Sequence, residues 1–516
     1  MASRTVHCRR LAAFLALIVA VAACNFPTAR FRRLTLEDVM ATMDAVTPVA
    51  TATLPATATL SPAATPIRIA RPFPAVDRPG APFAYTTRSG DTLEALARRF
   101  EVVPAQIASG GSLPSSGYLP IGQQLQIPNA LEAISPGGDV LPDGELVYSP
   151  AASDFDLVAF VDSAGGYLSR YNEAMGDGTV LRGAAIVQRI ADENSVNPRL
   201  LLALLEFRSG WVFGGSPPSG DAIQYPIGFR IPGRSGLYQD LTVAATQLNL
   251  GYYGWRAGTL VETSSTEAGT IRWNPTLNAG SVALLRLFVL LTESGQWLSA
   301  MVGSQGFPAV YEAMFGDAWS RAEAAGPVLP PGLEPPLLEL PFPPGERWSL
   351  TAGPHNAWTS GTPRGALDFS PITGGEPCAV SPAWVTASAP GVVVRAADNA
   401  VALDLDGDGR ESTGWVLLYY HLAASGSDGM ISPWVRVAAG DPLGHPSCQG
   451  GRATGKHVHM IRKYNGEWIA ADGPVPFILS GWRVLADPRN YYGSLVRGDE
   501  VVTSDSSGAR GSTIWR

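Results

Sequence analysis

The chain has 516 residues, a formal net charge of −8 at pH 7 and 46% hydrophobic residues. This length corresponds to about three domains, each long enough to bury its own core. Nucleic-acid binding requires a basic face, so the acidic balance argues against a nucleic-acid partner and fits a secreted, soluble surface.

The N-terminus has the pattern of an export signal. Arg4, Arg9 and Arg10 precede an apolar run that is too short for a comfortable membrane span. Cys24 follows small residues in the string VAAC and resembles the lipobox of bacterial lipoproteins. The resemblance implies cleavage of a signal peptide over residues 1–23 and lipid attachment at Cys24, which would anchor an extracytoplasmic chain to the membrane of the cell envelope. Ordinary signal cleavage nearby and an uncleaved anchor are the alternatives.

Residues 24–82 are predicted to be a linker. From about residue 47 the chain is rich in Pro, Ala and Thr, as in TPVATATLPATATLSPAATP. Such a segment cannot bury enough apolar surface to fold. We therefore expect a spacer that holds the folded part away from the membrane.

A small module is predicted over residues 83–129. Its pattern indicates a strand, a helix over 93–100, a second helix near Pro104 and a closing strand, which make a βααβ unit. The strings SGDTL, ALARRF and IGQQLQIP resemble the LysM family. The resemblance implies a shallow groove that binds N-acetylglucosamine chains; a folded spacer is the alternative. Its candidate glycan-binding residues are Gly90, Asp91, Thr92 and Ile107.

Residues 153–325 are predicted to be helical, because apolar residues recur at helical spacing in IVQRIADENSVNPRLLLALLEFRSGW, where Pro198 is well placed to open a helix. This string resembles the catalytic-helix region of lysozyme-like transglycosylases, which place a general-acid glutamate directly before Ser-Gly. Arg208 occupies that position, and Glu206 lies on a different helix face. We expect a degenerate lysozyme-like domain that binds or positions, with a muramidase acting through Glu206 as the alternative. Glu206 is also a candidate buried partner for Arg208 or Arg199.

A proline-rich linker over residues 326–338 separates this block from the last domain. There the strings GVVVRAA, NAVALDL, GWVLLYYH and KHVHMIRKY predict strands of an antiparallel β domain, with turns at glycines and at Asn465-Gly466. The final residues 497–516, rich in Ser, Gly and Asp, are predicted to be a flexible tail.

Five of the six histidines lie between His355 and His459. Alternate side chains of a strand share a face, so His457 and His459 should face one cavity. Catalytic zinc sites use histidine nitrogen and carboxylate oxygen, with three protein ligands and an open fourth position. The nearest plausible carboxylate is Asp368, in the string ALDFSP. This clustering favours a metal-dependent enzyme.

The strings around these histidines resemble the lysostaphin-type zinc endopeptidases, which cut peptidoglycan peptides, over roughly residues 339–496. Most members place the first His four residues before the Asp, where this chain has Arg364. The β-lytic branch places it well ahead, as His355 is here. The resemblance implies one zinc ion per chain, bound by His355, Asp368 and His459, and a site lined without metal binding by His421 and His457.

The chemistry of these residue types agrees with hydrolysis by metal-activated water. Zinc-bound water can ionise near neutral pH, and the metal polarises a scissile carbonyl. His421 and His457 are the candidates for accepting the proton of that water and for donating to the developing oxyanion, and the sequence does not say which does which. His445 matches no ligand position and is predicted to be a loop residue.

Two cysteines, Cys378 and Cys448, remain after export processing and flank the candidate site. An even pair in an exported domain predicts a disulfide, with reduced buried thiols as the alternative.

The string DLDGDGRE resembles the start of a calcium loop, with aspartates at alternate positions followed by glycine. Trp415 stands at the twelfth position, where a bidentate glutamate is needed. We therefore expect a polar hairpin turn, with Ca²⁺ binding as the alternative. Its three carboxylates are Asp404, Asp406 and Asp408.

These features together predict a three-domain, lipid-anchored, zinc-dependent endopeptidase that hydrolyses stem or cross-bridge peptides of peptidoglycan. A non-catalytic envelope scaffold or hydrolase activator is the alternative from a different functional class. The complete set of five site residues argues against it.

Overall fold

The computed structural model describes residues 80–265, 269–292, 296–423 and 429–516. The predicted signal peptide, Cys24 and nearly all of the linker over residues 24–82 lie outside these ranges. Among the helices described, none combines the length and the apolar character needed to cross a membrane.

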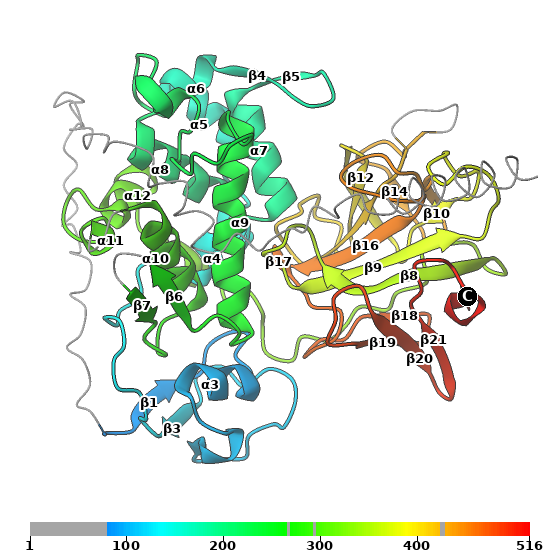
Figure 1. The fold of residues 1–516 in the computed structure, drawn as a ribbon, viewed down its shortest axis with the longest axis horizontal. Coiled ribbons are helices and arrows are strands. Elements are labelled where there is room, and N and C mark those ends of the chain that lie inside the picture. The colour runs from blue at the N-terminus through cyan, green and yellow to red at the C-terminus, as the bar shows by residue number, and fades with distance from the viewer. Residues whose placement is uncertain (1–79, 266–268, 293–295, 424–428) are drawn as a thin grey trace, which may run out of the picture. The chain divides into compact units, whose positions relative to one another are not determined.

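The small N-terminal module is a three-stranded sheet with one α-helix (Figure 1). Its helix begins where predicted, because the Thr92 side chain accepts a hydrogen bond from the backbone N–H of Ala95. The second helix predicted near Pro104 is only a 3₁₀ turn, because the chain becomes extended at Ile107, whose side chain enters the module core. The sheet order is β1-β3-β2. The elements are β1 (Phe83–Thr86), α3 (Leu93–Phe100), η2 (Pro104–Gln106), β2 (Ala108–Ser109) and β3 (Gln124–Ile127).

The middle module is mainly helical, as predicted. Helix α8 (Pro198–Ser209) begins at its proline, and the Asn197 side chain caps it by accepting from the N–H of Arg199. The other long helices are α7 (Gly183–Asn194), α9 (Leu237–Arg256) and α10 (Ala279–Leu291). The shorter elements are α4 (Asp143–Leu146), η3 (Pro150–Ala152), α5 (Leu157–Ala164), α6 (Tyr167–Arg170), β4 (Asn172–Ala174), β5 (Val180–Arg182), η4 (Gly220–Ile223), β6 (Glu262–Ser265), β7 (Gly269–Arg272), α11 (Gln296–Ser299), α12 (Phe307–Phe315) and α13 (Ala318–Ala325).

The middle module begins earlier than the predicted boundary at residue 153. Glu145 of α4 is fully buried and accepts hydrogen bonds from Asn197 Nδ2 at 3.1 Å and from Arg321 Nε at 2.9 Å. A buried carboxylate needs such partners, so α4 is part of this module. The earlier start of the module could not be predicted from the sequence, because a helix of four residues is too short to show a helical periodicity of apolar residues.

The C-terminal domain is built on a nine-stranded sheet whose path runs β14-β11-β12-β13-β16-β9-β8-β22, with β17 paired to β16 (Figure 1). Its ladders are antiparallel, as predicted. Every residue of β12 is buried, which shows that both faces of the sheet are covered there. The strands are β8 (Arg347–Asn356), β9 (Arg364–Pro371), β11 (Gly391–Ala397), β12 (Ala400–Asp404), β13 (Trp415–Tyr420), β14 (Arg436–Val437), β16 (Val458–Tyr464), β17 (Glu467–Trp468) and β22 (Thr513–Trp515).

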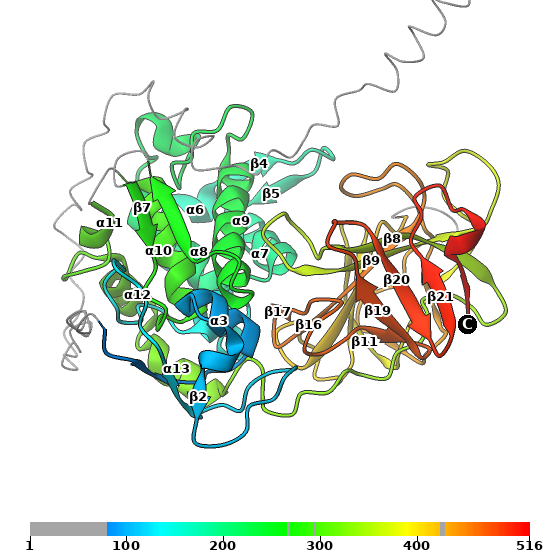
Figure 2. The same ribbon diagram turned by 60° about the horizontal axis from the view of Figure 1, so that its bottom comes forward.

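A second, four-stranded sheet in the order β18-β19-β20-β21 accompanies the large one, and Figure 2 shows β19, β20 and β21 side by side. Its core residues Trp482, Val484 and Leu495 join the same hydrophobic cluster as Trp348 and Phe369 of the large sheet. The remaining strands are β10 (Val385–Thr386), β15 (Pro442–Gly444), β18 (Ile478–Leu479), β19 (Trp482–Ala486), β20 (Gly493–Arg497) and β21 (Glu500–Thr503).

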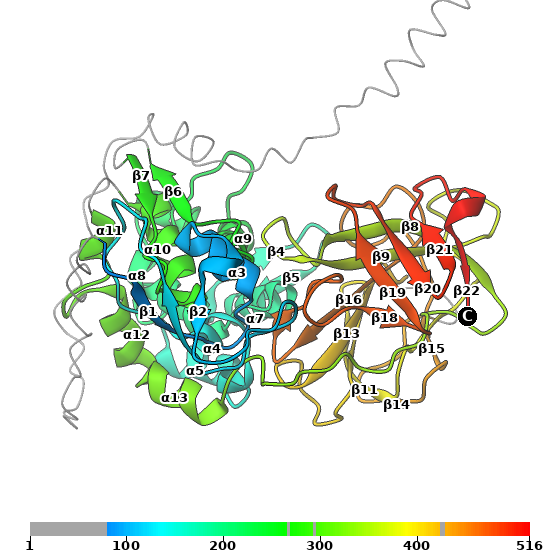
Figure 3. The ribbon, with the colours of Figure 1, turned by 90° about the horizontal axis from the view of Figure 1, so that it is seen from below.

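The prediction that residues 497–516 form a flexible tail is wrong. Residues 500–503 form β21, and β22 pairs with β8, as can be followed in Figure 3. Ile514 is fully buried in the domain core. The segment is polar overall and was therefore predicted to be a tail. A β-strand can bury one face with apolar residues at alternate positions alone, so a polar composition does not exclude it.

Candidate metal centre

Three neighbouring strands bring the candidate ligands together. His459 of β16 lies directly opposite Asp368 of β9 in the antiparallel ladder. On the other side of β9, the pairing of β8 shifts register between Ala352 and His355. Such irregularities re-aim side chains, and here the local shift accompanies the placement of His355 beside Asp368.

The ligand atoms form a tight triangle. His355 Nε2 lies 3.0 Å from His459 Nδ1 and 3.3 Å from Asp368 Oδ1. His459 Nδ1 lies 3.0 Å from the same carboxylate oxygen. All three residues are buried, with His355 only 4% exposed. Among the residues that the structure describes, these three and the Asp404 cluster are the groups able to share a metal ion.

The other ring nitrogens fix which atoms face the centre. His355 Nδ1 contacts the carbonyl oxygen of Gly353 at 2.9 Å, and His459 Nε2 contacts that of Ala357 at 2.9 Å. A carbonyl oxygen only accepts, so these nitrogens carry the hydrogens. The nitrogens that face Asp368 are then lone-pair donors, which is the arrangement of metal-binding imidazoles held by backbone carbonyls. The residues present therefore fit a zinc ion bound by two nitrogens and one oxygen.

The charges of the three groups are strongly coupled. Burial raises the pKa of Asp368, but His355 and His457 favour its carboxylate and hold the pKa well below its usual range. Burial lowers the pKa of His355, yet the Asp368 carboxylate outweighs it and the pKa is raised. Burial lowers the pKa of His459. The centre thus keeps an ionised carboxylate between two imidazoles.

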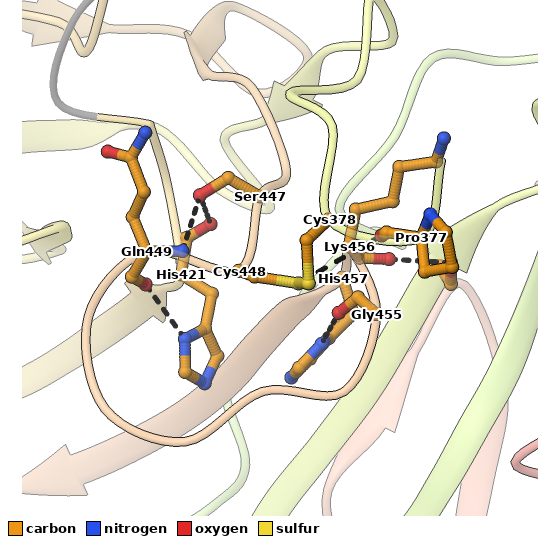
Figure 4. The surroundings of a disulfide bond; sticks show 10 residues. Pro377, Cys378, His421, Ser447, Cys448, Gln449, Gly455, Lys456 and His457 are labelled. Carbon is orange, nitrogen blue, oxygen red and sulfur yellow. Dashed lines mark hydrogen bonds between the residues drawn. A yellow bond between two sulfur atoms is a disulfide. The ribbon is translucent and has the colours of Figure 1, made fainter. Parts of the chain in front are cut away.

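His421 and His457 lie beside this triangle, and their catalytic role stays a prediction. Their ring centroids are 4.6 Å apart, and His457 Nε2 lies 3.7 Å from Asp368 Oδ2. Figure 4 shows that each ring donates its Nδ1 hydrogen to a backbone carbonyl, of Gln449 at 3.0 Å for His421 and of Gly455 at 2.7 Å for His457. Both Nε2 atoms are consequently the ones available for proton transfer.

Burial, followed by the neighbouring His457 and His459, lowers the pKa of His421 to about 4. Its imidazole is therefore neutral near neutral pH, with its lone pair on Nε2.

The predicted disulfide is confirmed, since Cys378 and Cys448 are bonded. It joins two loops beside the non-ligand histidines (Figure 4). The backbone N–H of Lys456 also donates to Pro377 O at 2.7 Å, so the loop over residues 447–457 is attached at two points. This is the loop that supplies the Gln449 and Gly455 carbonyls.

Tyr491 is a site residue that the sequence did not reveal. Its ring stacks on His355, with centroids 4.5 Å apart and an interplanar angle of 20°. It remains 54% exposed, so part of the ring faces solvent beside the candidate centre. No local pattern marks it, because the contact arises from pairing between distant loops.

His445 does not belong to the centre, as predicted. Its Nδ1 contacts Ala383 O at 2.9 Å, and its ring lies against Trp384 with centroids 3.8 Å apart.

The aspartates of the predicted calcium loop have oxygens close enough to share an ion. However, Asp404 already accepts from the backbone N–H groups of Asp406, Gly407 and Gly409. Asp408 accepts from the N–H of Arg410 and the hydroxyl of Thr413. These bonds are those of a polar turn, and no comparison with known proteins supports calcium.

The four candidate glycan-binding residues have structural contacts within their module. Asp91 is 2% exposed, forms an ion pair with Arg99 at 3.0 Å and accepts from Tyr85 Oη at 2.7 Å. Gly90 is buried at a φ of 77°, Thr92 caps α3, and Ile107 lies in the core. The Asp91 and Ile107 side chains are therefore not exposed for contact with a ligand.

Glu206 accepts hydrogen bonds from the N–H groups of Val212 and Phe213, both at 3.0 Å. It is not paired with either arginine that the sequence suggested. Arg208 Nε donates to Ile227 O, and Arg199 pairs with Asp154. The turn after Gly210 brings these N–H groups back to Glu206, which spacing alone does not show.

Comparisons with known proteins find similarities to peptidases and to a LysM domain. Family models described as the LasA N-terminal domain and the LysM domain match residues 139–328 and 85–128. The chain is 25% identical to Protease LasA of Pseudomonas aeruginosa over 368 residues, 68% of this chain and 78% of that protein. It is 30% identical to the beta-lytic metalloendopeptidase of Achromobacter lyticus over 158 residues, 30% of this chain and 40% of that protein. The solved structure of pseudoalterin, a deep-sea M23 metalloprotease, aligns with 35% of this chain and 98% of that chain at 24% identity and a TM-score of 0.28.

The LysM prediction is confirmed by its family model. The helical module matches the LasA N-terminal domain, and its lysozyme-like character stays a prediction. The chain is a metalloendopeptidase that carries a LysM domain and is similar to Protease LasA and to the beta-lytic metalloendopeptidases.

Proposed function

We propose that the chain is a zinc-dependent endopeptidase that hydrolyses stem or cross-bridge peptides of peptidoglycan. The observation that carries this proposal is the convergence of two imidazole nitrogens and one carboxylate oxygen, with distances of 3.0, 3.3 and 3.0 Å among them. His355, Asp368 and His459 would hold the ion, one per chain. When bound, zinc lowers the pKa of water and polarises a peptide carbonyl.

His421 is assigned the role of general base. Its Nδ1 hydrogen is committed to Gln449 O, which leaves the lone pair on Nε2. That nitrogen can take a proton from the attacking water. His457 is assigned the second role, contact with the developing oxyanion, because its Nε2 lies at the edge of the centre, 3.7 Å from Asp368 Oδ2.

The LysM module would direct this activity to the cell wall by binding glycan chains. The candidate contacts are the two strand-to-helix loops, at Gly90 to Thr92 and around Ile107. Since the Asp91 and Ile107 side chains are buried, we assign sugar contact to the backbone of these loops.

The proposed location is extracytoplasmic, with lipid attached at Cys24 to anchor the chain to the membrane. The Cys378–Cys448 disulfide supports an oxidising compartment.

The test is mass spectrometry of purified peptidoglycan digested with the zinc-loaded chain, beside an EDTA-treated sample. We expect new peptide amino termini that disappear with EDTA. New glycan ends that resist EDTA would instead assign the activity to a muramidase in the helical module. Intact peptidoglycan in both samples would favour a scaffold or hydrolase activator.

A further inference from the structure

Arg364 stands at the start of β9 and connects two segments that border the metal centre. Its guanidinium donates three hydrogen bonds, all to backbone carbonyls. Nε donates to Pro354 O at 3.1 Å, Nη1 to Pro488 O at 3.4 Å and Nη2 to Arg489 O at 2.8 Å. Only the fixed fork of an arginine offers several N–H donors in such different directions.

Both segments lead directly to the residues beside the metal. Pro354 immediately precedes the candidate ligand His355, and Pro488 and Arg489 immediately precede the turn to Tyr491. The segments also bond to one another. Tyr491 N–H donates to Pro354 O at 3.2 Å, and Gly353 N–H donates to Tyr491 O at 2.8 Å.

The ring of Tyr491 stacks on His355 as a result of this pairing, at 4.5 Å between centroids. Its backbone has a φ of 74°, in the left-handed region that residues other than glycine rarely adopt. A strained backbone conformation persists only where surrounding contacts hold it in place. The three hydrogen bonds from Arg364 to neighbouring backbone carbonyls are among the contacts that hold this loop.

We propose that Arg364 is a positioning residue for the endopeptidase reaction. It ties Pro354 to the loop over residues 488–491, which keeps Tyr491 stacked on His355 and makes that half-exposed ring a fixed surface beside the candidate centre. The assignment rests on the proposed function, in which His355 binds zinc and a peptide binds beside it. The hydrogen bonds of Arg364 itself go to backbone carbonyls and not to the ligand atoms.

A double-mutant cycle tests this role. The variants are R364A, Y491A and R364A/Y491A, measured for the zinc dissociation constant by chelator competition and for kcat and KM on purified peptidoglycan. We expect R364A to raise the zinc dissociation constant or to lower kcat by about 10- to 100-fold, the usual cost of losing an outer partner of a metal site. Adding R364A to Y491A should change either quantity by less than about twofold, because the two residues act as one unit.

Arg489 provides the matched control. It is an arginine on the same loop, its side chain pairs with Asp487 at 2.9 Å, and it lies over the Tyr492 ring. R489A removes the same charge without touching Pro354, so zinc affinity and kcat should stay within about twofold of the parent chain. An R489A effect as large as that of R364A would overturn the proposal, as would full additivity in the cycle.

R364K covers the case in which R364A does not fold. A single ammonium cannot reach three carbonyls, so R364K should show most of the R364A defect at unchanged charge. Parental zinc affinity and kcat in R364K would overturn the proposal. Failure of the parent chain to cleave peptidoglycan would reject the proposed function alone, since the zinc measurements need no substrate.

Discussion

His355 Nε2 and His459 Nδ1 face one another at 3.0 Å, although each ring donates its other nitrogen's hydrogen to a backbone carbonyl. With Asp368 Oδ1 they form a cluster of acceptors that repel unless a cation or a proton lies among them. The metal-free chain should therefore hold a proton at this centre and release it when zinc binds.

The pH dependence of zinc binding follows from this proton. Burial lowers the pKa of His355, but Asp368 outweighs it and the pKa is raised. Zinc needs the neutral imidazole, so zinc affinity should fall as the pH falls through this raised pKa. Zinc titrations over a range of pH should show the zinc dissociation constant rising as the pH falls through this pKa. A dissociation constant that does not change with pH would contradict the expectation.

Replacing the candidate ligand His459 with alanine should abolish both zinc binding and peptide-bond cleavage. Even outer partners of metal sites are worth about 10- to 100-fold, so H459A should lose more than about 100-fold in zinc affinity. H445A is the control, because the His445 ring contacts Ala383 O and Trp384 outside the centre. A role in cell-wall turnover that survives H459A would indicate a scaffold.

Breaking the Cys378–Cys448 disulfide should impair catalysis more than zinc binding. The loop that it fixes presents the Gln449 and Gly455 carbonyls to His421 and His457, whereas the ligand rings contact other carbonyls. The C378S/C448S variant should lose about 10- to 100-fold in kcat and keep its zinc content. Metal analysis and peptidoglycan kinetics on the same sample check this. An unchanged kcat would mean that the loop holds its shape unaided.

Glu206 should contribute to stability and not to catalysis. Its carboxylate accepts from the N–H groups of Val212 and Phe213, and E206Q weakens these charge-assisted bonds. We expect a loss of about 1 kcal/mol in unfolding free energy with parental peptidoglycan cleavage. Loss of glycan-cleaving products in E206Q would instead support the muramidase alternative.

Burial of Ile514 should make the last strand essential to stability. Ile514 is fully buried, so I514A should cost about 2 to 5 kcal/mol in a denaturant titration. V501A is the control, since Val501 is 61% exposed and its truncation should change stability by less than about 0.5 kcal/mol. Similar losses in both variants would contradict the assigned packing.

Local signals in the sequence predicted the candidate ligands and several helix starts. The resemblance to zinc endopeptidases implied His355, Asp368 and His459 as ligands, strand periodicity predicted that His457 and His459 share a face, and Asn197 with Pro198 marked the start of α8. Contacts between distant loops could not be predicted from the sequence, because no local pattern shows where such loops meet. The stacking of Tyr491 on His355 and the three hydrogen bonds from Arg364 to backbone carbonyls are contacts of this kind.

The pairing of β22 with β8 has a consequence for the behaviour of the domain in solution. β8 carries His355, and on the side away from β9 its Trp348 pairs with Ile514. Without β22 that edge would present unpaired N–H and C=O groups, which recruit strands from other chains. A second copy could supply the same short strand, so partial unfolding of the last residues offers a route to exchange of β22 between molecules, with each protomer completing the sheet of its neighbour.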